Sequence, residues 1–370
     1  MTRIEKLIAG INLQAAIGVE IGALCNPILR KGDANVLYVD YADADTLRQH
    51  YAGNPLVDPA KIVETDAIWG EKTLKEALGK EVDFVVASHV IEHVPDLITW
   101  LGELHSVLSP SGEIRLAIPD RRFTFDFLRR ETEIAEVLSA HLVRARVPQP
   151  YFLLDYYLNA TQVDAYSAWR GEVRSETLQR PDNLETVLAW ARDVAQNGTY
   201  RDAHCWVFTP RSFARLFEQL GRAGLIQLAC ERFHDTEENT IEFFVALKAS
   251  DDRTLVAESW RSMSEAARVD VPGSFEALQV KHDAALSELQ EELTTARAMQ
   301  EKLLSDHNRL LFERDRLVGE QERLSADHEQ LKAAAASAEQ RLSLLERSRS
   351  WKITRPLRAV STALRGSQNG

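Results

Sequence analysis

Cysteine is scarce in this sequence, which limits the kinds of site that cysteine can build. Only three cysteines occur in 370 residues, Cys25, Cys205 and Cys230, and no two of them have a CxxC spacing. An odd, widely spaced set favours neither a disulfide framework nor a zinc site. We therefore expect a protein of a reducing compartment, and the sequence assigns no metal ligand.

Long apolar runs and excess positive charge are also missing. The first residues lack the apolar core and cleavage site of a signal peptide, and no run of about 18 apolar residues could cross a bilayer. The formal net charge is -12, whereas non-specific nucleic-acid binding needs a basic surface. These absences predict a cytoplasmic protein that has no nucleic-acid partner.

The sequence changes character near residue 270. Before it, β-branched and aromatic runs alternate with helical periods, as in an α/β domain. After it, proline disappears for more than eighty residues and Glu, Leu, Ala, Arg and Gln dominate. We divide the chain into an α/β domain (1–250), a linker (251–274), a coiled coil (275–347) and a basic amphipathic tail (348–370).

Short apolar runs bounded by turn residues predict buried parallel strands in the first domain. These runs are Ile17–Ile21, Val36–Val39, Ile62–Glu64, Val82–Ser88 and Glu113–Ile118.

Helical periods and a later pair of strands complete the predicted domain. Helices are expected at Glu71–Gly79 and Asp96–Leu108, and an antiparallel pair at Leu225–Arg232 and Ile241–Lys248. An insertion at about 121–203 is too long for a bare loop and predicts a helical cap.

The segment 275–347 has the clearest periodicity. Every seventh residue from Leu289 to Leu345 is leucine or alanine, which is the seam of a coiled coil. The other seam position includes Gln300, His307 and Arg314, polar residues that fix register and strand number. The sequence predicts a homo-oligomer joined by this coil, with a single solvated helix as the alternative.

The tail alternates basic and apolar residues in SWKITRPLR, which begins at Ser350. A basic amphipathic element with a Trp can lie on an anionic membrane surface or bind a protein partner. We expect peripheral contact with the inner membrane, and a frayed terminus is the alternative.

Three strand ends carry residues suited to a nucleoside. Glu20 and Gly22 close the first strand, and glycine there lets the backbone approach a ligand. Asp40 follows the second strand, where a carboxylate can accept both hydroxyls of a ribose. Asp66 follows the third expected strand and could accept a hydrogen bond from an adenine amine.

At these residues the chain resembles the class I S-adenosylmethionine-dependent methyltransferases. The resemblance rests on GVEIGALCNP, VLYVDYAD, IVETDAIW and VDFVVASHVIEHVPD, and it covers about residues 15–250. It implies a Rossmann-like seven-stranded sheet with a helical insertion, followed by the coiled coil, and S-adenosyl-L-methionine as cofactor.

The resemblance also implies roles for individual residues. Glu20 and Gly22 would line the methionine end of the cofactor, Asp40 would hold the ribose and Asp66 would lie at the adenine. The residues expected beside the transferable methyl group are Ser88 and His89.

Two features depart from the family pattern. Leu24 and Asn26 stand where further glycines are common, and about fourteen residues separate the first two strands, too few for a full helix. A nicotinamide enzyme would need an intact GxGxxG turn for its pyrophosphate, so the loop counts more against that alternative than against methyl transfer.

Methyl transfer to a hydroxyl requires a group that takes up a proton. His93, Asp120 and His204 are the candidate bases, each at or near a strand end. A structural role is the alternative for both histidines.

The tail resembles a terminal signature of bacterial enzymes of surface-polysaccharide assembly. It suggests O-methylation of a bacterial glycan or its lipid-linked precursor, although a small-molecule acceptor stays open. The competing hypothesis is a catalytically inactive methyltransferase-like scaffold that acts through its coiled coil.

Overall fold

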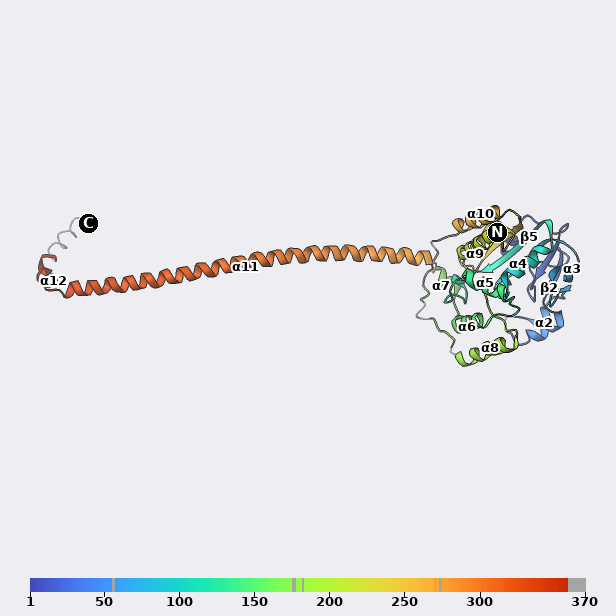
Figure 1. The fold of residues 1–370 in the computed structure, drawn as a ribbon, viewed down its shortest axis with the longest axis horizontal. Helices are drawn as coiled ribbons and strands as arrows, with labels where there is room; N and C mark the ends of the chain where they lie inside the picture. The colour runs from blue at the N-terminus through green and yellow to red at the C-terminus, as the bar shows by residue number, and fades with distance from the viewer. Residues whose placement is uncertain (55–56, 175–177, 182, 270, 273–274, 359–370) are drawn as a thin grey trace. The chain divides into compact units, whose positions relative to one another are not determined.

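The computed structural model describes residues 1–54, 57–174, 178–181, 183–269, 271–272 and 275–358. The α/β domain is built around a seven-stranded sheet in the order β3-β2-β1-β4-β5-β7-β6. Figure 1 labels β2 and β5 of this sheet. The strands are β1 (Ile17–Ile21), β2 (Asn35–Asp40), β3 (Ala67–Ile68), β4 (Val82–Ser88), β5 (Leu108–Pro119), β6 (Leu228–His234) and β7 (Glu242–Ala249).

The strand directions confirm the expected fold class. The first five strands run parallel, and β7 lies antiparallel between β5 and β6. Because β1 is flanked by β2 and β4, the carboxyl ends of these three strands lie side by side. Ligands of open parallel sheets bind at such an edge, so the topology places a candidate site there.

One expected strand is wrong in position. We expected the third strand at Ile62–Glu64, but β3 comes after it, where Trp69 N–H donates to Asp40 O (2.8 Å). Ile62 is buried in a cluster with Ala44 and Leu47 of α2 (Ala44–His50). The apolar run therefore packs under a helix instead of joining the sheet.

The two faces of the sheet are covered by different helices. On β4, Val85 and Ala87 point into one apolar cluster and Phe84 and Val86 into the other, because side chains alternate along a strand. The first cluster is covered by α3 (Leu74–Leu78), α4 (Leu97–Ser106), α9 (Pro210–Ala223) and α10 (Arg253–Ala266). The second is covered by α1 (Arg3–Ile8).

The expected linker at 251–274 needs correction. Most of it is α10, which begins after the capping residue Asp252 and packs on α9 and β6. Trp260 is fully buried, and its Nε1–H donates to Leu228 O (2.8 Å). The α/β domain therefore extends past residue 250, because α10 supplies part of its core.

The insertion is helical. It contains α5 (Ile134–Leu142), α6 (Pro150–Asn159), α7 (Ala165–Trp169) and α8 (Leu184–Asn197). Its first helix, α5, packs on α4 and buries Val137 and Ala140 in the main core. The helices α6 and α8 pack against each other, and both are visible in the lower part of the domain in Figure 1.

The segment after the domain forms one helix, α11 (Phe275–Arg347), and a short helix, α12 (Arg349–Ile353). At 1.5 Å per residue, α11 is about 110 Å long. Its seam leucines are largely exposed in the single chain, for example Leu310 at 60% and Leu331 at 70%. The helix is confirmed, and its pairing with other copies stays a prediction.

Part of the expected tail has no described structure. Residues 359–370, including Val360 and Leu364, lie outside the part of the chain that the structure describes. Among the helices that are described, none combines the length and the hydropathy that crossing a membrane requires.

Candidate functional site

Gly22 directly follows β1, and Asp40 and Ser88 are the last residues of the neighbouring strands β2 and β4. Gly22 has a φ of +68°, and a Cβ there would lie 3.0 Å from Val90 Cγ2. A side chain at this position would therefore be strained and crowded, which agrees with the close backbone approach expected of this glycine.

Asp40 has a carboxylate that can receive a ligand. It is half-buried, and its Oδ1 accepts a hydrogen bond from Tyr41 N–H (2.8 Å). Burial raises the pKa of Asp40 to about 6, although the Tyr41 hydrogen bond lowers it. Among the described residues, Oδ2 accepts no hydrogen bond. This geometry suits two hydroxyls of a ribose.

Glu20 and Asp66 use their oxygens inside the protein. Buried Glu20 accepts hydrogen bonds from the backbone N–H groups of Ile28 (2.6 Å) and Leu29 (2.9 Å). These bonds shape the loop that joins β1 to β2, in which no helix forms between residues 22 and 34, as the spacing predicted. Asp66 accepts from Tyr38 N–H (2.8 Å) and pairs with Lys31 Nζ (2.6 Å). Direct contact of either carboxylate with a cofactor stays a prediction.

Ser88 is the last residue of β4 and His89 follows it, and neighbouring side chains hold both. Arg3 donates to Ser88 Oγ and forms an ion pair with Glu242 (2.6 Å). His89 Nε2 lies 2.8 Å from Glu242 Oε2. His89 also has a φ of +53°, so the chain turns sharply straight after β4.

Two titratable side chains that follow this turn lie close to a third from the end of the insertion. Glu92 and His93 belong to the short 3₁₀ helix Ile91–His93, and His204 comes from the end of the insertion. One potential ligand atom from each lies within 4.8 Å of the others. The two imidazole rings meet edge to face, with centroids 4.5 Å apart. We call Glu92, His93 and His204 the site cluster.

Each histidine of the site cluster is oriented by a carboxylate. His93 Nδ1 lies 2.7 Å from Asp202 Oδ1, and His204 Nδ1 lies 2.6 Å from Asp126 Oδ2. Asp126 is itself bonded to buried Arg129. Burial lowers the pKa of His93, but Asp202 and Glu92 together raise it to about 9.

Glu92 is fully buried, yet neither of its oxygens has a hydrogen-bond partner among the described residues. The basic side chains that lie nearest are His89, whose Nδ1 is 3.8 Å from Oε1, and His93, whose Nε2 is 3.9 Å from it. A buried carboxylate of this kind is costly unless another group compensates its charge.

Aromatic side chains surround the site cluster. Tyr156 stacks on His204 at a centroid distance of 5.3 Å, and Phe125 lies 4.9 Å from the same ring. Tyr200 donates from its hydroxyl to Asp202 (3.2 Å) and its ring lies 6.4 Å from that of Tyr41. Since Tyr41 follows Asp40, these rings connect the expected ribose position with the site cluster.

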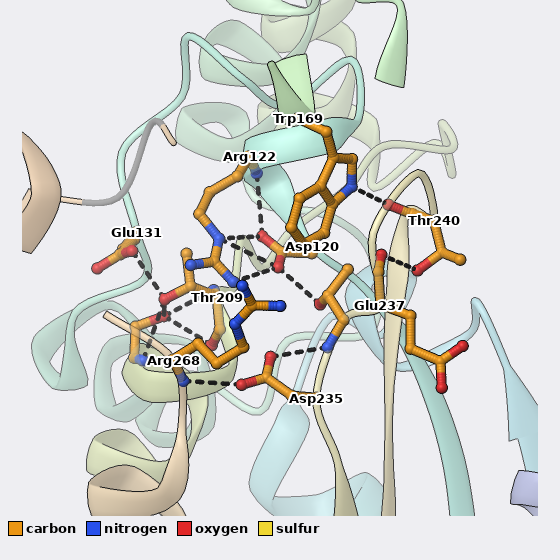
Figure 2. A network of polar contacts seen from close by, with 11 residues as sticks. Asp120, Arg122, Glu131, Trp169, Thr209, Asp235, Glu237, Thr240 and Arg268 are labelled. Carbon is orange, nitrogen blue, oxygen red and sulfur yellow. Dashed lines mark hydrogen bonds and ion pairs between the residues drawn. The ribbon is translucent and has the colours of Figure 1, made fainter. Parts of the chain in front are cut away.

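The third candidate base, Asp120, lies in a different environment. It is fully buried, and Arg122 binds it through Nε and Nη2, the latter at 2.6 Å from Oδ2 (Figure 2). Thr236 Oγ1–H donates to the same carboxylate (2.8 Å). Both oxygens are therefore engaged, which argues against Asp120 as the base and gives it a structural role.

Sequence reasoning missed three residues of this site. Glu92 stood inside the SHVIEHVPD segment but was not singled out, and Asp126 and Asp202 were not considered. The motif could have indicated Glu92. The two aspartates lie 33 and 109 residues beyond His93 in the chain, so only the fold brings them to the histidines.

Comparison with known proteins gives the family. Residues 17–224, more than half of the chain, match the model of a methyltransferase domain. The mitochondrial ubiquinone biosynthesis O-methyltransferase of Bos taurus is 34% identical over 100 residues, which are 26% of this chain and 26% of the bovine protein. The chain thus spans about a quarter of the length of this curated relative.

Solved structures with a similar arrangement include two methyltransferases. The CcbJ methyltransferase from Streptomyces caelestis is 12% identical, with a TM-score of 0.33. This match covers 68% of the present chain and 97% of the CcbJ chain. Magnesium protoporphyrin IX methyltransferase from Synechocystis, solved with bound SAH, is 10% identical, with a TM-score of 0.31. This match covers 67% of the present chain and 80% of the Synechocystis chain. From the family model and the sheet topology, the chain belongs to the S-adenosylmethionine-dependent methyltransferases.

Proposed function

We propose that this chain transfers the methyl group of S-adenosylmethionine to a hydroxyl of a bacterial glycan or its lipid-linked precursor. The observation that supports it most is the site cluster, a buried carboxylate and two carboxylate-held histidines. Glu92 and His93 lie four and five residues after Ser88, the last residue of β4. Family membership favours this enzyme over the inactive scaffold.

Gly22 and Asp40 fit the cofactor. A Cβ at Gly22 would fill the space beside Val90, and Asp40 offers a free carboxylate oxygen for the ribose. The bound cofactor supplies an activated methyl group on a sulfonium, which leaves as a neutral thioether. The protein must align the acceptor oxygen with that methyl group and take up the hydroxyl proton. We assign the removal of this proton to the site cluster.

Several features support a sugar as acceptor. Exposed aromatic faces bind sugar rings by stacking on their C–H groups, and Phe125 and Tyr200 are 40% and 44% exposed beside the site cluster. Asp202 and Tyr156 provide polar groups at the same place. The resemblance of SWKITRPLR to polysaccharide enzymes points in the same direction.

The C-terminal segments would organise the enzyme. We propose that the leucine seam of α11 joins copies of the chain, because these leucines are exposed in a single copy. The basic tail would hold the assembly at the cytoplasmic face of the inner membrane or against a protein partner.

The acceptor is tested with methyl-labelled S-adenosylmethionine and the full-length chain. Lipid-linked saccharides extracted from bacterial membranes should take up the label, and hydrolysis should release an O-methyl sugar. Phe125→Ala should raise the KM for the saccharide with little change in cofactor affinity. Phe312→Ala, which removes an exposed ring from α11 (76% exposed), is the matched control.

Label that appears only in phenolic or amine acceptors, with none in saccharides, would contradict the glycan assignment but leave methyl transfer intact. No transfer to any acceptor by a chain that binds the cofactor would support the scaffold instead.

A further inference from the structure

The buried carboxylate of Glu92 lacks the partner that a buried charge requires. Its side chain is completely buried, and both carboxylate oxygens lack hydrogen-bond partners among the described residues. Buried carboxylates in folded proteins are paired, hydrogen-bonded or bound to a metal ion. The side-chain nitrogens of His89 and His93 that face Oε1 lie 3.8 Å and 3.9 Å away, beyond hydrogen-bond distance. A group that binds these oxygens directly would compensate the charge of the carboxylate.

The two histidines of the site cluster are arranged as metal ligands. The Nδ1 atoms of His93 and His204 face Asp202 and Asp126, respectively. A histidine that binds a metal through one ring nitrogen nearly always donates the N–H of the other nitrogen to a carboxylate, a carbonyl or water. A carboxylate partner fixes the tautomer and makes the imidazole a stronger metal ligand. Nε2 of each ring is then the nitrogen available for an ion, and His93 Nε2 faces Glu92.

The distances fit this interpretation. The candidate ligand atoms of Glu92, His93 and His204 all lie within 4.8 Å of one another. Ligand atoms around an ion with bond lengths of about 2.1 Å lie about 3 to 3.5 Å apart. A shift of about 1 Å, within the reach of side-chain rotation, would close the cluster on an ion.

We propose that Glu92, His93 and His204 bind one divalent transition-metal ion. Two imidazoles and one carboxylate suit Zn²⁺, Mn²⁺, Fe²⁺ or Co²⁺ better than Mg²⁺ or Ca²⁺, which prefer oxygen ligands. Three protein ligands leave a coordination position open for another oxygen. The ion would compensate the charge of Glu92, and the carboxylates behind the histidines would orient the site.

The site would deepen the proposed function, and this role, unlike the binding itself, rests on that proposal. An acceptor hydroxyl bound at the open position would lose its proton more readily, because the ion stabilises the alkoxide. The O–H bond would break and its proton would pass to solvent or a nearby base. The oxygen would then attack the methyl carbon while the C–S bond breaks, and the cofactor would leave as a neutral thioether. No oxidant or reductant is needed.

Metal binding is measured without any acceptor. Untagged full-length protein, cleared of metal with a chelator, is titrated calorimetrically with Zn²⁺ and with Mn²⁺. We expect one ion per chain for at least one metal. His204→Ala should weaken that binding at least 100-fold. His141→Ala is the control, because His141 also lies beside a carboxylate, Asp96, but is half-buried and lies outside the site cluster.

Co²⁺ absorption spectroscopy on the wild-type chain gives a second readout that does not depend on a variant folding. A d–d spectrum typical of nitrogen and oxygen ligands in a low-symmetry site should appear with one equivalent. No binding of any of these ions by wild-type protein, or equal binding by wild type and a folded His204→Ala chain, would overturn the site. S-adenosylmethionine titrated into the same samples separates this failure from loss of the methyltransferase pocket.

Discussion

At the scale of residues, the environment of a carboxylate decides what it can do. Asp40 and Asp120 both follow a strand of the same sheet, and both were candidates for function. Asp40 keeps one oxygen free at the edge of the sheet, whereas both oxygens of Asp120 are bound by Arg122 and Thr236. The first can therefore bind a ligand, and the second holds the protein together.

The raised pKa of Asp40 predicts a pH dependence of cofactor binding. Only the ionised carboxylate accepts two hydroxyl hydrogen bonds, and its pKa is about 6. The affinity for S-adenosylmethionine should be constant above about pH 7 and fall about tenfold per unit below pH 6. Calorimetric titrations between pH 5 and 8 measure this. In Asp40→Asn, binding should be weaker and nearly independent of pH, and an unchanged profile would contradict the role of Asp40.

Asp120→Ala should destabilise the protein strongly. It would leave the buried guanidinium of Arg122 without its counter-charge, which costs about 3–5 kcal/mol. Glu71→Ala is the control, because it breaks an exposed pair with Arg146 worth less than about 1 kcal/mol. Urea unfolding compares the two. A stable Asp120→Ala chain that has lost methyl transfer would restore Asp120 as the base.

Individual residues of the site were predictable only where a strand end or a motif marked them. Gly22, Asp40, His93 and His204 could be chosen because the sequence shows a glycine or a polar residue beside a buried run. The bonds of Glu20 to Ile28 and Leu29 depend on the conformation of a loop, which no local pattern specifies. Asp126 and Asp202 required the packing of the insertion against the end of β4.

At the scale of elements, helix α10 shows how a local pattern can mislead. Its segment is polar on average and follows the last strand, so it resembled a linker. Its apolar residues Val256, Trp260 and Met263 nevertheless lie on one face and are buried in the main core. The helical spacing of these residues is visible in the sequence. The surface against which they pack depends on the order of the strands, which the sequence does not show.

Trp260→Ala should therefore lower the free energy of unfolding by about 3–5 kcal/mol, because it opens a large cavity under α10. Leu255→Ala, on the same helix but 50% exposed, should change it by no more than about 0.5 kcal/mol. Urea denaturation of both variants tests whether α10 belongs to the domain. Equal stability of the two would show that it does not.

The short strand β3 illustrates a second limit at this scale. Ile62–Glu64 and Ala67–Ile68 are both short runs with apolar residues, and periodicity does not distinguish them. The structure selects the second because Ile62 is needed beneath α2. The other strands lie within five residues of the expected bounds, and each is longer than β3.

At the scale of the whole molecule, the chain consists of two units, residues 1–281 and 282–370. The composition changes near residue 270, inside the first unit and shortly before this boundary. The exposed leucines of α11 have no partner in one copy of the helix, and burial of such a seam is what drives coiled-coil formation.

Removal of residues 282–370 should convert an oligomer into a folded monomer. The remaining unit keeps the whole sheet and α10, so its cofactor affinity should stay the same. Light scattering gives the mass of both forms. A full-length chain that is already monomeric, or a truncated chain with unchanged stoichiometry, would contradict assembly through α11.

The central claim is that the carboxyl ends of β1, β2 and β4 form a pocket for S-adenosylmethionine. The most direct test is a calorimetric titration of the full-length chain with S-adenosylmethionine and with its demethylated product. Asp40→Ala is compared with Asp45→Ala, an exposed aspartate on α2. We expect micromolar binding that Asp40→Ala weakens at least tenfold and Asp45→Ala leaves unchanged. A folded wild-type chain that binds neither compound would contradict the account.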